Sequence, residues 1–245
     1  MDEARFRSST AGTWDALAAD YDSERNSDRV YHACVRQAVA DLRPAGVVLE
    51  CGCGTGLATR HLLATESVAT VHAVDFSETM LETVREKFPA HEVETTRADL
   101  RQLPYPDGTF DCVLAANVLQ HLVPDDQPVA AAEILRVLRP GGRYSVSVHH
   151  YSTDKQQRGW EKEGKPGQPG VDYIFRYTRE ELARLFPGAR IRAVGFYGWP
   201  AQMLITRTVG HALARLGRGH MISAHGRRAR SGAKWRAGLP RLHAQ

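Results

Sequence analysis

The segment VVLECGCGTG, residues 47–56, constrains the fold more than any other part of this 245-residue chain. A short apolar run at 47–50 leads into Gly52, Gly54 and Gly56, and a helix is expected to follow as far as residue 65. Glycine lets the backbone turn sharply and come close to a ligand, and the amino end of a helix presents unpaired N–H groups to an anionic group. The segment therefore predicts a strand, a ligand-binding loop and a helix in succession.

The alternation of strand and helix patterns continues to residue 150. We predict further strands at 68–75, 91–97, 110–117 and 143–150, and helices at 29–42, at 76–88 with Ser77 as its N-cap, and at 125–139. Such alternation is typical of βαβ units, whose right-handed crossovers place helices on both faces of a parallel sheet. We therefore predict an α/β fold with a doubly wound, mostly parallel seven-stranded sheet, in which ligands bind outside the carboxyl ends of the strands.

The pattern changes after residue 150. Residues 151–172 are polar and rich in glycine and proline, which predicts a long insertion that serves as a lid. A capping box from Thr178 to Glu181 predicts a helix at 178–186. The remaining elements expected are a strand at 189–199, a helix at 201–216 and a last, edge strand at 220–225.

Charge is distributed unevenly along the chain, although the formal net charge is only +4. Residues 1–181 contain all 28 acidic residues, whereas residues 182–245 contain 12 Lys and Arg and no acid. We expect a single domain over 1–226, with N-terminal helices within 12–42, and a mobile basic tail over 227–245. Such a tail is either a solvated extension or a contact for nucleic acid or an anionic membrane.

Several features favour a cytoplasmic protein. No apolar stretch approaches the ~18 residues of a membrane span, and the start of the chain, MDEARFRSST, lacks the apolar core of a secretory signal. Four cysteines are too few for a disulfide scaffold at this length. Cys51 and Cys53 have no further Cys or His at metal-ligand spacing, so we interpret them as small packing residues and expect no metal site.

An acidic residue stands where a nucleoside ligand would need one. Asp75 ends the second predicted strand, 19 residues after Gly56, and its carboxylate can accept hydrogen bonds from both hydroxyls of a ribose. A nicotinamide dinucleotide fingerprint would require a third glycine at position 57, which is Leu57. That interpretation also leaves Glu50 unexplained.

The motifs together resemble a known family. Glu50-x-Gly52-x-Gly54-x-Gly56 resembles motif I of the class I S-adenosylmethionine-dependent methyltransferases. The similarity continues in order through DFSxxML (75–81), ADL (98–100), LPYPDGxFD (103–111), NVLQHL (117–122) and LRVLRPGG (135–142). The branch that looks most similar is that of the ubiquinone and menaquinone biosynthesis methyltransferases and their natural-product relatives.

The resemblance implies roles for individual residues. The three glycines would pass under the amino-acid and ribose parts of S-adenosylmethionine, next to Glu50, and Asp75 would hold the ribose hydroxyls. Around the adenine and the methionine end it implies Phe76 and Met80 as flanking side chains, Asp99 as acceptor from the adenine amino group, the backbone of Leu100 and Asn117, and Tyr21 as a cover.

Methyl transfer to a phenol or an acidic carbon gains from a general base, whereas an unprotonated amine needs none. His121 follows the fourth predicted strand, and His149 and His150 end the fifth, so all three are candidate bases at the carboxyl edge of the sheet. Each is also consistent with a purely structural role. Four aromatic residues would form an apolar wall for the acceptor or belong to the core: Tyr151, Trp160, Tyr197 and Trp199.

These observations favour one function over three others. We expect an enzyme that methylates an O, N or C nucleophile of a small-molecule acceptor. The alternatives are an RNA or protein methyltransferase that uses the basic C-terminal segment, a non-catalytic nucleoside-binding protein with the same fold, and a dehydrogenase.

Overall fold

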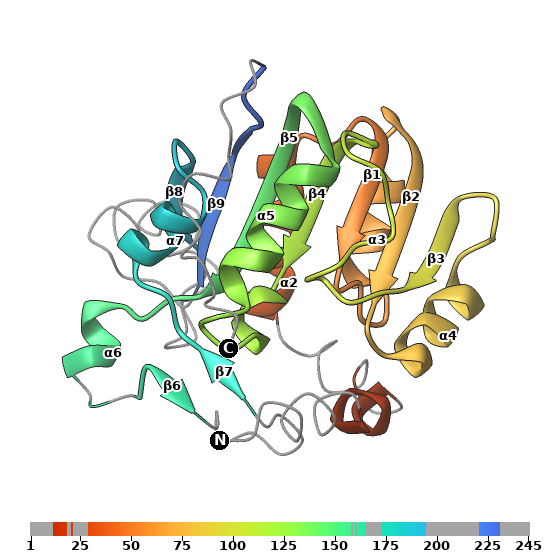
Figure 1. The fold of residues 1–245 in the computed structure, drawn as a ribbon. Helices are drawn as coiled ribbons and strands as arrows, with labels where there is room; N and C mark the ends of the chain where they lie inside the picture. The colour runs from red at the N-terminus through yellow and green to blue at the C-terminus, as the bar shows by residue number, and fades with distance from the viewer. Residues whose placement is uncertain are drawn as a thin grey trace, which may run out of the picture.

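A seven-stranded sheet forms the centre of the computed structural model, which describes residues 12–18, 21, 29–157, 159, 161–164, 173–194 and 221–230. The strand order is β3-β2-β1-β4-β5-β9-β8 (Figure 1). The strands are β1 (Gly46–Cys51), β2 (Val68–Asp75), β3 (Val93–Arg97), β4 (Phe110–Ala116), β5 (Leu138–His149), β8 (Arg190–Val194) and β9 (Met221–Arg227). β1 to β5 are mutually parallel, and the mostly parallel, doubly wound sheet expected from the sequence is confirmed.

The last strand occupies a different place from the one expected. β9 was predicted as an edge strand, but it lies inside the sheet, antiparallel to both β5 and β8. Residues Met221 to Ala224 are accordingly buried. The edge on this side is formed by β8, because a strand that arrives last in the chain can still insert between two earlier ones.

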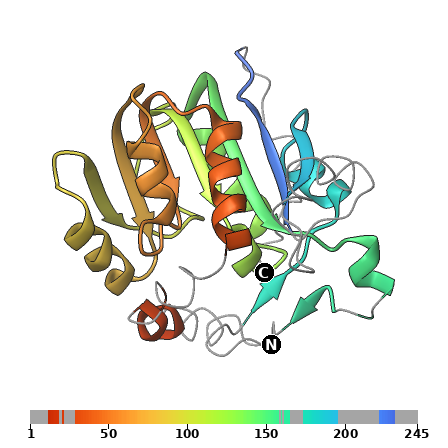
Figure 2. The same ribbon diagram turned by 180° about the vertical axis from the view of Figure 1, so that it is seen from behind.

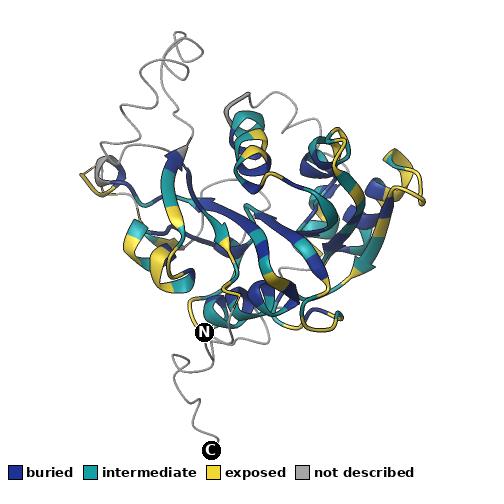
Figure 3. Ribbon diagram, turned by 90° about the horizontal axis from the view of Figure 1, so that it is seen from above, coloured by how far each residue is buried: buried dark blue, intermediate teal, exposed yellow. Residues whose placement is uncertain are grey.

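Helices cover both faces of the sheet (Figures 1 and 2). α2 (Arg29–Leu42), α3 (Leu57–Leu63) and α4 (Glu78–Lys87) share one hydrophobic cluster with the sheet, and α5 (Gln127–Val137) and α7 (Arg179–Leu185) share the other. The side chains of β4 alternate between the two clusters, as the pleat of a strand requires. The strands are therefore largely buried, whereas the outer helices keep exposed positions (Figure 3).

Two helix starts follow the capping rules that the sequence suggested. The Ser77 hydroxyl accepts a hydrogen bond of 3.2 Å from the Met80 N–H at the start of α4. Thr178 and Glu181 form the predicted capping box of α7. One boundary differs: the helix expected to reach residue 139 ends at Val137, and β5 begins at Leu138 instead of the expected residue 143.

The region after β5 is described in part. Within the predicted insertion 151–172, the chain forms a helical turn, α6 (Thr153–Gln157), and β6 (Glu163–Gly164), which pairs with β7 (Ile174–Phe175). Trp160, Tyr197, Trp199 and the helix expected at 201–216 lie outside the described residues. None of the described helices is long and apolar enough to cross a membrane.

Candidate cofactor and acceptor cleft

A cleft of about 180 Å³ opens at the carboxyl ends of β1, β2 and β4, the ends to which the arrows of these strands point in Figure 1. The N-terminal helical residues contribute Trp14 and Tyr21 to its wall. The predicted cofactor residues that line it are Tyr21, Glu50, Gly52, Gly54, Asp75, Phe76, Met80, Asp99, Leu100 and Asn117. The fold thus brings together residues that are spread over almost 100 positions of the chain.

Asp75 holds the glycine loop and the start of the next helix through hydrogen bonds to the backbone. Its two carboxylate oxygens accept hydrogen bonds from the backbone N–H of Gly54 at 2.9 Å and of Ser77 at 3.0 Å. Each carboxylate oxygen has a second lone pair, so the group retains capacity for two hydroxyl donors. Burial raises the pKa of Asp75 above its usual value, while the hydrogen bonds from the loop oppose that rise.

Gly56 has a different role from the one that the resemblance implies. It does not line the cleft; it is the N-cap of α3, with a φ of +89°. A Cβ atom there would lie 2.6 Å from the ring of Phe88. At Gly54, by contrast, a Cβ would meet only the ring of Tyr21, at 3.9 Å. The third glycine of the motif therefore serves the packing of α3 against α4, and Gly54 borders the cleft.

Glu50 is a buried acid at the end of β1. It is 2% exposed, and its carboxylate accepts a hydrogen bond of 2.6 Å from the Thr59 hydroxyl in α3. Burial raises the pKa of Glu50 to about 8, although the hydrogen bond from Thr59 lowers it. The cleft therefore holds an acid whose charge depends on what binds beside it.

Phe76 and Met80 differ in exposure. Phe76 is 37% exposed, whereas Met80 is 2% exposed and buried beneath the cleft wall. The Arg97 guanidinium lies 5.9 Å from the centre of the Phe76 ring, and Arg97 Nε donates to the carbonyl oxygen of Phe76 at 3.0 Å. An exposed ring with a buried thioether nearby forms a surface on which a flat heterocycle can stack.

Asp99 has a partner that the sequence did not suggest. Its carboxylate accepts hydrogen bonds from Arg101 Nε at 2.9 and 3.0 Å, and the other end of the guanidinium reaches Asp126 at 2.6 Å. Arg101 and Asp126 also line the cleft. Nothing in the local sequence distinguishes Arg101 from a solvated arginine, because its second partner comes from the start of α5, 25 positions away.

Asn117 sits in an unusual backbone conformation at the end of β4. Its φ is +62°, one of two positive values among non-glycine residues in the described part of the chain. Its side-chain Nδ2 is buried, and no described residue accepts a hydrogen bond from it. The Nδ2 group is therefore a donor that a ligand in the cleft can satisfy.

Among the three candidate bases, only His121 lines the cleft. Its Nδ1 lies 3.1 Å from the carbonyl oxygen of Tyr173, beside β7. A carbonyl can only accept, so in the neutral ring the proton is on Nδ1 and Nε2 is the basic nitrogen. The Trp14 ring packs edge-on against the imidazole, 4.9 Å between centroids.

Gln120 orients the other side of the imidazole. Its Oε1 accepts a hydrogen bond of 2.9 Å from the backbone N–H of His149, so its NH₂ group faces His121 Nε2 at 3.5 Å. His149 and His150 do not line the cleft; the carbonyl oxygens of His149 and His150 accept from the Tyr177 N–H and from Lys155 Nζ. The contribution of Gln120, which is buried, was missed because glutamine carries no sequence signal of its own.

The four cysteines are buried and reduced. Burial raises the pKa of the thiols of Cys51 and Cys53 well above the usual value, so neither is a nucleophile near neutral pH. Their interpretation as packing residues agrees with this environment. No cluster of three metal-ligating side chains occurs among the described residues.

The donors and acceptors of the cleft fit S-adenosylmethionine. Asp75 offers acceptors for a ribose, Phe76 a stacking surface, Asn117 Nδ2 an unsatisfied donor, and Glu50 an acid for a cationic group. Gly52, with a φ of +66°, brings the backbone to the cleft wall where a side chain would collide with Val118.

Comparison with known proteins supports this assignment. Residues 49–146 match the methyltransferase domain family described as "Methyltransferase domain". The chain is 36% identical over 163 residues to a malonyl-[acyl-carrier protein] O-methyltransferase of Halorhodospira halophila (62% of this chain, 52% of the relative). It is 34% identical over 145 residues to a ubiquinone/menaquinone biosynthesis C-methyltransferase of Saccharophagus degradans (56% and 57%). The chain spans about half the length of these curated relatives.

A solved structure extends the similarity to nearly the whole fold. The 1,6-didemethyltoxoflavin-N1-methyltransferase of Burkholderia thailandensis, bound to 1,6-didemethyltoxoflavin and S-adenosylhomocysteine, superposes with a TM-score of 0.66 over 94% of this chain and 91% of that one. At 18% sequence identity, this likeness shows the fold. Residues 49–146 are thus similar to the methyltransferase domain of S-adenosylmethionine-dependent enzymes, and the fold around them is that of the solved methyltransferase.

Proposed function

We propose that this protein transfers a methyl group from S-adenosylmethionine to an O, N or C nucleophile of a small-molecule acceptor. The observation that carries the proposal is the cleft itself, where Asp75, Glu50 and Asn117 from three neighbouring strand ends face the same space as His121. The bound sulfonium supplies an activated methyl group whose leaving group departs neutral. The protein therefore needs to align the two reactants and exclude water rather than to protonate a leaving group.

The family resemblance and the places of these residues in the cleft support the following roles. Asp75 and the Gly52–Gly54 loop hold the nucleoside and amino-acid parts of the cofactor, and Phe76 and Asp99 border the adenine. His121 Nε2, which the Gln120 NH₂ group approaches only to 3.5 Å, accepts the proton of a hydroxyl or acidic-carbon acceptor, while the Tyr173 carbonyl holds Nδ1–H in place. For an amine acceptor, alignment alone suffices.

The lining near His121 favours a small acceptor. Trp14, Leu122 and Val123 make this part of the cleft apolar, and the N-terminal helical residues lie across it. The Ser77 hydroxyl donates a hydrogen bond of 2.5 Å to Asp15, which ties that helix to the loop after β2. An opening bordered in this way suits a flat or extended small molecule better than a folded macromolecule.

The first test is isothermal titration of the protein with S-adenosylmethionine, and the proposal fails if no binding occurs up to millimolar cofactor. The second is formation of S-adenosylhomocysteine with a panel of phenol, amine and carboxylate acceptors. If the protein methylates bulk tRNA with a steep salt dependence and turns over none of the panel, the acceptor is RNA and not a small molecule.

A further inference from the structure

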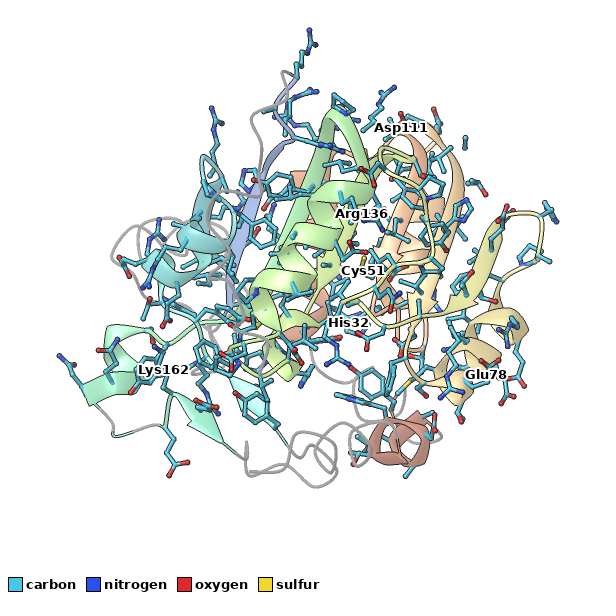
Figure 4. The ribbon with its side chains drawn as sticks, in the orientation of Figure 1. His32, Cys51, Glu78, Asp111, Arg136 and Lys162 are labelled. Carbon is cyan, nitrogen blue, oxygen red and sulfur yellow. The ribbon has the colours of Figure 1, made fainter. Side chains whose placement is uncertain are left out.

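A second cavity lies at the amino edge of the sheet, at the opposite ends of β1 and β4 from the cofactor cleft. Its volume is about 130 Å³. Figure 4 labels one of its residues, Asp111, at the upper end of the sheet. The other lining residues are Ala45, Gly46, Arg139, Gly141, Gly142, Arg143 and Arg227. Three guanidinium groups thus share the cavity with one carboxylate.

Two of these arginines face each other across neighbouring strands. Arg143 of β5 is directly opposite Arg227 of β9 in the antiparallel register. Directly opposed residues project from the same face of a sheet, and like charges in such a pair destabilise it. Both residues line the cavity, so two like charges lie close together beside it.

The single carboxylate pairs with only one of the three arginines, Arg139. Asp111 accepts a hydrogen bond of 2.8 Å from the Val47 N–H and one of 2.8 Å from Arg139 Nε. No described salt bridge joins Arg143 or Arg227 to an acid. Arg227 Nη1 donates to the carbonyl oxygen of Gly141 at 3.0 Å, a neutral acceptor, so its charge has no counter-ion in the part of the chain that the structure describes.

Arg143 is also short of hydrogen-bond acceptors. Its Nε is buried and has no partner among the described residues. Its Nη2 has only the Cys112 sulfur, at 3.7 Å, and sulfur is a weak acceptor. A buried guanidinium donor without an acceptor is costly, and an anion in the cavity would supply what is missing.

We propose that this cavity is a binding site for a phosphate group, separate from the cofactor cleft. The planar fork of a guanidinium matches the oxygens of a phosphate, and paired, charge-assisted hydrogen bonds make such contacts strong. Arg143 and Arg227 bind the group from two neighbouring strands, and Arg139 borders it. The phosphate belongs either to a small phosphorylated molecule or to the backbone of a nucleic acid.

The test uses the full-length protein and inorganic phosphate as the probe. Thermal unfolding is followed at constant ionic strength while sodium chloride is replaced by sodium phosphate. A ligand that binds only the folded state raises Tm in a saturable way, so the Tm of the wild type should rise. Arg227→Gln and Arg143→Met should each weaken phosphate binding about tenfold, because each removes charge-assisted hydrogen bonds.

Arg184→Gln is the matched control, because Arg184 is exposed on α7 and does not line the cavity. It removes the same charge and should leave the phosphate response unchanged. Since Arg227 is exposed, the Arg227→Gln variant keeps the test valid even if Arg143→Met folds poorly. A wild-type response no larger than in chloride, or an equal response in Arg227→Gln, would overturn the proposal.

An RNA-binding measurement separates the two sources of phosphate. A single-stranded RNA ten-mer is titrated into the wild type and Arg227→Gln at several salt concentrations. Weaker RNA binding by the variant, with a salt slope smaller by about one, assigns the site to a nucleic-acid backbone. RNA binding unchanged by the substitution, with the response to inorganic phosphate lost, assigns it to a small phosphorylated molecule.

Discussion

The Thr59 hydroxyl donates a hydrogen bond of 2.6 Å to the buried carboxylate of Glu50, and so links the start of α3 to the end of β1. Burial nevertheless dominates, and the pKa of Glu50 is raised from 4.5 to about 8. The folded protein therefore binds a proton at Glu50 over a pH range in which the unfolded chain has released it. Two predictions about pH and cofactor binding follow from this relationship.

The stability that Glu50 contributes is fully present below pH 4.5 and is lost as the pH rises through about 8, because the folded state binds more protons over this range. Between pH 6 and pH 9 this contribution falls by roughly 2–3 kcal/mol. Glu50→Gln keeps the acceptor for Thr59 but does not titrate, so this part of the pH dependence should disappear. Urea unfolding of both proteins at pH 6 and pH 9 measures the change in the free energy of unfolding. An equal change in the wild type and in Glu50→Gln would contradict the raised pKa of Glu50.

A cation bound beside Glu50 stabilises its ionised form and lowers its pKa. Binding of S-adenosylmethionine at pH 7 should therefore release a proton from the wild type and none from Glu50→Gln. Calorimetry in two buffers with different ionisation enthalpies counts the protons. Equal proton release by both proteins would show that the cofactor's cationic groups lie away from Glu50.

Asp75→Ala should weaken cofactor binding by roughly 2–4 kcal/mol, because two charge-assisted hydrogen bonds to the ribose are lost. Asp75→Asn keeps one acceptor and should lose less. The dissociation constants come from the same titration, with a nicotinamide dinucleotide as a competitor that should have no effect. A change below about tenfold in Asp75→Ala would exclude Asp75 as the ribose ligand.

Gly54→Ala should mainly lower cofactor affinity, whereas Gly56→Ala should mainly lower the stability of the fold. The Cβ of Gly56→Ala would lie 2.6 Å from Phe88 at a φ of +89°, so we expect a loss of stability of about 2–4 kcal/mol with cofactor affinity retained. Gly54→Ala is also strained, at a φ of +51°, but its methyl group lies beside the cleft with no contact below 3.9 Å, so we expect a smaller loss of stability than in Gly56→Ala and a larger loss of affinity. Unfolding and titration of both variants are compared, and the reverse order would refute the division of roles.

His121→Gln should lower turnover of a hydroxyl or acidic-carbon acceptor roughly 10²–10⁴-fold while cofactor affinity remains near wild type. Glutamine can replace the donor to the Tyr173 carbonyl but cannot take up a proton. Initial rates and cofactor dissociation constants are measured on the same preparations. His149→Gln is the control, because His149 lies outside the cleft and should keep most of the activity. Retention of a third of the activity by His121→Gln would mean that alignment alone drives the reaction.

Local sequence rules predicted the elements that depend on neighbours in the chain. The glycine loop after β1, the Ser77 cap and the Thr178–Glu181 capping box each involve residues within a few positions of one another. The parallel sheet followed from the strand-and-helix alternation, because parallel strands need crossover helices. The cofactor residues, by contrast, were listed from the resemblance to the methyltransferase family, and all of them except Gly56 line the same cleft.

Only the tertiary structure decided where distant residues meet. Examples are the interior place of β9, the ion pair of Arg101 with Asp126, and the register that sets Arg143 opposite Arg227. These contacts join positions that are 25 to 84 residues apart. The same is true of His121, which alone of the three candidate bases lines the cleft and whose tautomer depends on the Tyr173 carbonyl, 52 positions later. Sequence periodicity reports which face of an element is apolar, whereas burial, charge pairing and the choice of tautomer depend on contacts that form only when the elements pack.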